Sequence, residues 1–165
     1  MDGSEALLAL AEIAIGIAGF AAITLVLSRN RDSLSPELLF IIRTMIVNSV
    51  ATAFLALFPW VLESVTLVRS EVWRWSSAAW VLFVLFGVWP VYIREQRDLA
   101  LRNDAGAFRL AVVGWGLGGL ALIVHFANVF GWPLDPSFSA FYLGLWLALG
   151  VAGISFVFLI YRLLR

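Results

Sequence analysis

The last apolar segment of the chain, residues 138–161, reads FSAFYLGLWLALGVAGISFVFLIY and contains no charged residue. A helix needs about 20 mainly apolar residues to cross the hydrocarbon core of a bilayer, so this segment is long enough to span one. Four more segments of this kind precede it, at residues 6–27, 38–62, 72–93 and 110–131. Backbone groups left unpaired in lipid are costly, and five short strands could not close a barrel. The sequence therefore predicts an all-α bundle of five transmembrane helices, forming a single integral membrane domain over residues 1–165.

The composition of the chain supports a membrane protein and excludes several other classes. Of the 165 residues, 62% are hydrophobic and 13% are charged, whereas soluble domains carry about 45–50% apolar and about 25% charged residues. The lack of cysteine excludes disulfides and thiolate metal sites, and His125 is the only histidine. All positive charges are Arg, so no Lys can form a Schiff base. Acidic and basic residues balance at 11 each, which gives no overall field for nucleic acid. We expect no metal, no cofactor and no nucleic-acid partner.

The arginines are divided unevenly between the two sides of the predicted bundle. One side has only Arg69 and Arg74, close to Glu63 and Glu71. The other side, which follows spans one, three and five, has Arg29, Arg31, Arg94, Arg97, Arg102, Arg109, Arg162 and Arg165. Because cytoplasmic loops carry an excess of Arg and Lys, we expect the N-terminus outside and the C-terminus in the cytoplasm. The use of Arg in place of Lys, with much Ala, Gly and Trp, indicates a GC-rich genome and favours a bacterial cytoplasmic (inner) membrane.

Polar residues beside three of the apolar segments predict where helices begin. Ser35-Pro36 offers a capping hydroxyl followed by Pro at the first helical position. Asp135-Pro136 predicts the start of the fifth span in the same way, and Asp104 is the expected cap of the fourth.

Small residues recur on one face of three of the predicted helices. In lipid, helices associate through close backbone approach and buried polar contacts, which small residues allow. The expected packing positions are Gly16 and Gly19 in span one, Gly114 and Gly118 in span four, and Gly144, Ala148 and Ala152 in span five. We expect these faces to contact other helices, either in the same chain or in another subunit.

A few polar residues lie in or beside the spans, where each is a candidate functional group. They are Glu12, Asn48, Glu63, His125 and Asn128. Glu12 and His125 each lie about six residues, or roughly 9 Å, from the outer end of their spans, so their depths match. A buried carboxylate beside an imidazole can titrate near neutrality and bind a proton or an ion. The same residues could equally serve as interhelical hydrogen bonds or as contacts for a ligand. Arg43 lies near the cytoplasmic end of span two, where its side chain can reach the interface.

Tryptophan is abundant, with eight copies. Trp60, Trp73, Trp75 and Trp132 occupy the positions of an aromatic belt at the outer interface. Deeper tryptophans, among them Trp80 and Trp115, face lipid or a partner helix, or form an aromatic pocket for a quinone, lipid or pigment.

Two functions are consistent with this sequence. No Ser/His/Asp arrangement, paired intramembrane aspartates or His-rich motif is present, so we do not expect catalysis. The first hypothesis is a small non-catalytic membrane protein that oligomerises, or acts as an accessory subunit of a larger membrane complex, through its small-residue faces. The alternative is a proton- or ion-conducting channel or transporter that uses the polar cluster around Glu12 and His125.

Overall fold

The computed structural model describes residues 3–28, 35–65, 68–100, 105–133 and 135–163, and no strand occurs among them. The helices are α1 (Gly3–Ser28), α2 (Pro36–Glu63), α3 (Arg69–Leu82), η1 (Phe83–Val88), α4 (Trp89–Ala100), α5 (Ala105–Phe130) and α6 (Phe138–Leu163). Because α3, η1 and α4 follow one another without a break, they form one long helix. Five helices are thus long and apolar enough to cross a membrane, which confirms the all-α class and the five predicted segments.

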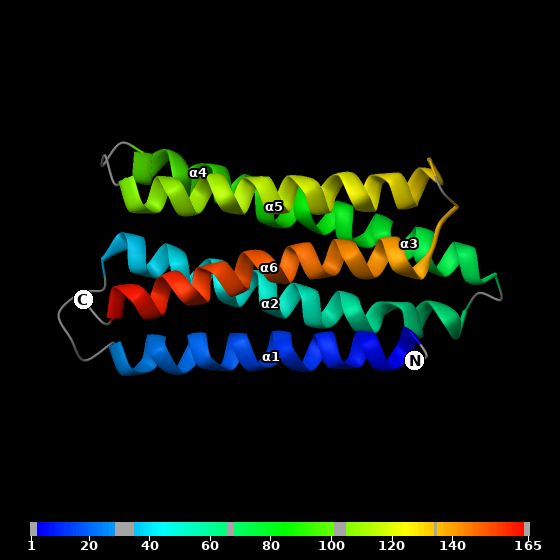
Figure 1. Ribbon diagram of the computed structural model, residues 1–165, viewed down its shortest axis with the longest axis horizontal. Coiled ribbons are helices and arrows are strands. Elements are labelled where there is room, and N and C mark those ends of the chain that lie inside the picture. The colour runs from blue at the N-terminus through cyan, green and yellow to red at the C-terminus, as the bar shows by residue number, and fades with distance from the viewer. Residues whose placement is uncertain (1–2, 29–34, 66–67, 101–104, 134, 164–165) are drawn as a thin grey trace.

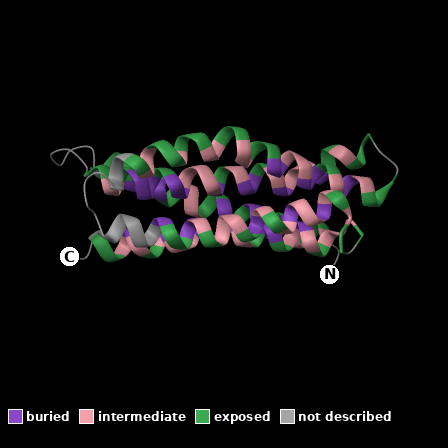
Figure 2. Cartoon of the chain, turned by 90° about the horizontal axis from the view of Figure 1, so that it is seen from above, coloured by how far each residue is buried: buried purple, intermediate pink, exposed green. Residues whose placement is uncertain are grey.

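The five long helices lie side by side, roughly parallel to the long axis of the molecule (Figure 1). α2 and α6 lie at the centre, α1 packs on their outer side, and α5 with the long α3–η1–α4 helix packs on the other side. Buried residues follow the inner sides of the helices (Figure 2). The outside is also apolar, since Val26, Phe54, Phe86 and Phe130 are 70 to 77% exposed.

The predicted cap of α2 agrees with the structure, whereas the predicted cap of α6 does not. The Leu38 backbone N–H donates to Ser35 Oγ at 3.2 Å, with Pro36 as the first helical residue, so this predicted cap is confirmed. α6 begins at Phe138, the first residue of the predicted span, but the cap predicted at Asp135-Pro136 is wrong, because the Ala140 N–H donates to Ser137 Oγ at 3.3 Å. The expected cap Asp104 lies outside the described residues.

The third long helix contains a π-helical turn that the sequence analysis did not predict. In η1 the hydrogen bonds skip one more residue than in an α-helix, and the Trp89 N–H donates to the Val84 carbonyl. Pro90 follows directly, lacks an N–H, and in an α-helix its ring would press on the carbonyl four residues earlier. A π turn is one of the arrangements that accommodate such a break without ending the helix.

A tight turn after α5 sets the direction of α6. Gly131 has a φ of +66°, and the Trp132 N–H donates to the Ala127 carbonyl at 3.1 Å. This is the hydrogen bond of a helix end closed by a left-handed residue, a conformation that favours glycine. The chain therefore reverses within a few residues, and α6 runs back along α5.

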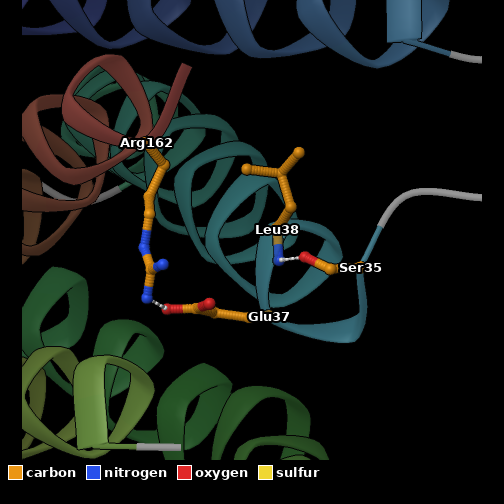
Figure 3. Close-up of polar contacts among 4 residues, drawn as sticks. All are labelled: Ser35, Glu37, Leu38 and Arg162. Atoms are coloured by element: carbon orange, nitrogen blue, oxygen red, sulfur yellow. Dashed lines mark hydrogen bonds and ion pairs between the residues drawn. The ribbon is translucent and has the colours of Figure 1, made fainter. Parts of the chain in front are cut away.

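Ion pairs join helices at the end of the bundle where α2 begins and α6 ends (Figure 3). Arg162 Nη2, in the last turn of α6, lies 2.6 Å from Glu37 Oε1 in the first turn of α2. Arg43 on α2 pairs with Glu95 on α4. Arg43, which we expected to extend to the interface, is thus also a link between two helices.

Candidate functional site

A buried polar cluster joins α3, α5 and the start of α6. Asn128 Nδ2 donates to Ser77 Oγ at 2.8 Å and to the Trp73 carbonyl at 3.3 Å, while Asn128 Oδ1 accepts from the Ser137 backbone N–H at 2.8 Å. His125 Nδ1 lies 3.2 Å from Ser77 Oγ. The side chains of Ser77, His125 and Asn128 are buried. One asparagine thus connects two helices and the turn before a third.

The imidazole of His125 occupies a closed slot between three helices. Its ring stacks on Trp80 with a centroid separation of 4.3 Å and meets the ring of Phe141 edge-on at 5.6 Å. On the side of α6 it fills the space that a side chain at Gly144 would take, because a Cβ there would lie 2.3 Å from His125 Nε2. This geometry fits the interhelical hydrogen-bond interpretation of His125 and Asn128.

The structure does not bring Glu12 to this cluster. Glu12 is exposed on α1, and the residues nearest to it on the inward face of that helix are Leu7, Leu10, Ala11 and Ala14. These residues are apolar and pack tightly against the central helices, so Glu12 lies on the outside. The hypothesis of conduction past a Glu12 and His125 pair therefore loses the juxtaposition on which it rested.

The other two predicted polar residues also lie apart from the cluster. Asn48 is near the middle of α2, where its Nδ2 donates to the Thr44 carbonyl at 2.8 Å. Glu63 is exposed at the end of α2 and, with Arg69 and Trp60, lines a cavity of about 400 Å³ beside the start of α1.

The small residues divide into two groups. Buried positions that contact the chain's own helices are Gly114, Gly144, Ala148 and Ala152. A Cβ at Gly16, Gly19 or Gly118 would meet nothing within 4 Å. No helix among the described residues packs closely on these three glycines, so their expected contact with another helix stays a prediction.

A cavity of about 80 Å³ lies between the central helices, α5 and the long α3–η1–α4 helix. Its aromatic walls are Trp80, Trp89, Tyr92 and Trp115, and Trp80 separates it from the ring of His125. Asn48 contributes an amide to the wall. The remaining lining residues are small or aliphatic: Val84, Val88, Gly114, Gly118, Gly119, Leu122, Ala148 and Val151. This arrangement can hold a small, mainly apolar group.

Comparison with known families, curated proteins and solved structures finds no match. Among the described residues, no three His, Asp or Glu side chains gather where they could hold a metal ion.

Ser77 and Trp80 were not predicted to contact His125 and Asn128. Ser77 and Trp80 lie on one helical stripe with Trp73, at spacings of four and three residues, and this spacing was the available signal. Trp73, which we expected in an interfacial belt, is buried against Phe138 and Phe141.

Proposed function

We propose that this chain is a non-catalytic, multi-pass membrane subunit that associates with a second copy of itself through the outward face of α1. We define this α1 face by Ala9, Glu12, Gly16, Gly19 and Ile23, all of which are exposed. The observation that carries the proposal is the position of Glu12. It lies roughly 14 Å along the helix from Gly3, at 1.5 Å per residue, within an otherwise apolar segment.

A carboxyl group that faces hydrocarbon is costly, by about 2.5–3.5 kcal/mol for an acidic residue at a helix centre in insertion measurements. A protonated carboxyl group both donates and accepts hydrogen bonds. Two copies of Glu12 related by a two-fold axis can therefore satisfy each other, as a symmetric dimer requires of a self-complementary surface.

Gly16 and Gly19 supply the second requirement, which is close approach of two backbones. Both lie within two turns of Glu12 on the same face, and a Cβ at either position would meet nothing within 4 Å. Small residues on one face of a helix let helices pack at short distance in membranes. The α1 face thus combines two glycines, where a second helix can approach closely, with the Glu12 carboxyl group, which can hydrogen-bond to the same group in a second copy.

The proposed location is a bacterial inner membrane, with the N-terminus outside and the C-terminus in the cytoplasm. The exposed large apolar side chains support a lipid environment, because soluble proteins rarely expose extensive apolar surface. Described residues Arg43, Arg94, Arg97 and Arg162 belong to the helix ends near the C-terminus, and this bias supports the orientation.

Cysteine cross-linking tests the self-association directly, because the native chain contains no cysteine. We expect G16C to form a disulfide-linked dimer on mild oxidation in native membranes. The matched control is G116C on α5, which is also exposed with open space at its Cβ position and which should stay monomeric. Replacing Glu12 by Leu in G16C should weaken the dimer roughly threefold to fifteenfold, the equivalent of one interhelical hydrogen bond.

Two results would contradict the proposal. Equal dimer yields from G16C and G116C would mean that the cross-link reports random collisions. A G16C cross-link to a different protein, without homodimer, would replace the second copy by an accessory role in a larger complex. Unchanged thermal unfolding of each variant in detergent shows that the comparison is between folded proteins.

A further inference from the structure

We propose that the aromatic cavity binds a membrane-soluble molecule through a hydroxylated aromatic ring, such as a phenol or a hydroquinone. The cavity lies between α2, the α3–η1–α4 helix, α5 and α6, and its walls include Trp80, Trp89 and Trp115. Planar aromatic side chains favour ring ligands, which they contact by offset stacking or edge-to-face packing.

Asn48 supplies the hydrogen-bonding group that such a ligand needs. Its Nδ2 donates to the Thr44 carbonyl, and its Oδ1 accepts no hydrogen bond from the described residues. Asn48 lies near the middle of α2, where a spanning helix is farthest from water. An amide oxygen that lines an apolar cavity can accept a hydrogen bond from the hydroxyl of a ligand that enters it.

The size of the cavity limits the part of the ligand that enters. Its volume of about 80 Å³ is roughly half that of an enclosed apolar cavity known to take up benzene, about 150 Å³. A ring can therefore enter only in part, with its hydroxyl toward Asn48, and the remainder of the ligand extends outward between the helices.

The position of Asn48 distinguishes a ring ligand from an ordinary lipid tail. An acyl chain brings only methylene and methyl groups to the centre of a bilayer, and these cannot pair with an amide. A hydroxylated ring fills the same apolar space and also donates to Asn48 Oδ1. We therefore favour the ring ligand over a bound lipid chain.

The test uses 4-hexylphenol and hexylbenzene, which differ only in the hydroxyl group. The full chain is placed in phosphatidylcholine nanodiscs, and its melting temperature is followed as each compound is titrated. A compound that binds the folded state gives a saturable increase in melting temperature. We expect saturable stabilisation with 4-hexylphenol at a concentration about fivefold to tenfold lower than with hexylbenzene, the effect of one hydrogen bond.

Three variants locate the binding. Gly118→Val fills the cavity from a wall position where a Cβ meets nothing within 4 Å, and it should abolish the stabilisation. Gly116→Val adds the same side chain to the same helix outside the cavity and should preserve it. Asn48→Leu should remove the difference between the two compounds.

Several outcomes would overturn the inference. Equal responses to 4-hexylphenol and hexylbenzene in the native chain would indicate a site for hydrocarbon chains only. A shift that does not saturate, or that persists unchanged in Gly118→Val, would show general effects on the bilayer. Because Gly116→Val and the native chain set the reference for folding, a failure of Gly118→Val to fold would leave the Asn48→Leu comparison to decide.

Discussion

Gly144 shows how one missing side chain can position a buried imidazole. Gly144, which we expected at a helix-packing position, lies against the ring of His125. The ring is held on its other sides by Trp80 and Phe141. It therefore has little freedom to move away from α6, and the space at Gly144 is needed for Ser77 and His125 to meet.

We predict that Gly144→Ala destabilises the protein by about 1–3 kcal/mol, the usual range for overpacking a well-filled core. The added Cβ would lie 2.3 Å from His125 Nε2, so the ring or α6 must shift. Thermal unfolding in detergent measures the effect. Gly153→Ala on the same helix is the matched control, because its Cβ would meet nothing within 4 Å. Similar melting temperatures for the two variants would show that the slot is looser than the structure indicates.

The α3–η1–α4 helix illustrates an irregularity at the scale of an element. A π turn contains one residue more than the α-helical turn that it replaces, so it changes the direction in which later side chains point. In this helix, Ser77 and Trp80 precede the turn, whereas Trp89 and Tyr92 follow it. One helix thus contributes both to the polar cluster and, through Trp89 and Tyr92, to the wall of the aromatic cavity. The extra residue of the π turn determines how these two sets of side chains are rotated relative to each other.

Deleting Gly87 from η1 should be tolerated, because the π turn can become an α-helical turn while the side chains before and after it keep their directions. The same deletion in a regular helix rotates everything beyond it by about 100°. Removing Leu120 from α5 should therefore pull His125 and Asn128 away from Ser77. We expect the Gly87 deletion to give a monodisperse protein with a clear unfolding transition and the Leu120 deletion to give neither. Equal damage from both deletions would argue against the extra residue as the source of the irregularity.

The whole molecule places its helix ends in two groups. α1, α4 and α6 end at the same side of the bundle, where α2 and α5 begin (Figure 1). The pairs of Arg162 with Glu37 and of Arg43 with Glu95 join helices near that side. Ion pairs at a protein surface contribute about 0–1 kcal/mol each, so these two pairs add little to the stability of the bundle.

The proposed orientation predicts which positions a membrane-impermeant maleimide can reach. Trp132 and Arg97 are both exposed and lie toward opposite ends of the bundle, and the native chain has no cysteine to interfere. In intact bacterial cells we expect W132C to be labelled, and R97C only after the membrane is permeabilised. The reverse pattern would invert the orientation, and labelling of both in intact cells would contradict a spanning bundle.

The sequence by itself determined the number, the approximate limits and the helical state of the long segments. These depend on local properties, namely segment length, hydropathy and the capping hydroxyl of Ser35, and none of them requires a tertiary contact. The first turn of α2 was predictable to the residue for this reason. The capping residue of α6 was not, because Ser137 and Asp135-Pro136 are both acceptable caps on local grounds.

Tertiary structure alone decided which side of each helix faces inward. Apart from Glu12, the middle of α1 is apolar on every side. Helical projection could therefore place Glu12 on the same face as two glycines, but it could not predict whether that face points toward the other helices or away from them. Burial of Leu7 and Leu10 against the central helices turned Glu12 outward. The contacts of His125 with Ser77 and with the space at Gly144, on two other helices, were also not predictable. Contacts between distant segments depend on which helix faces pack together, and this is a property of the assembled bundle.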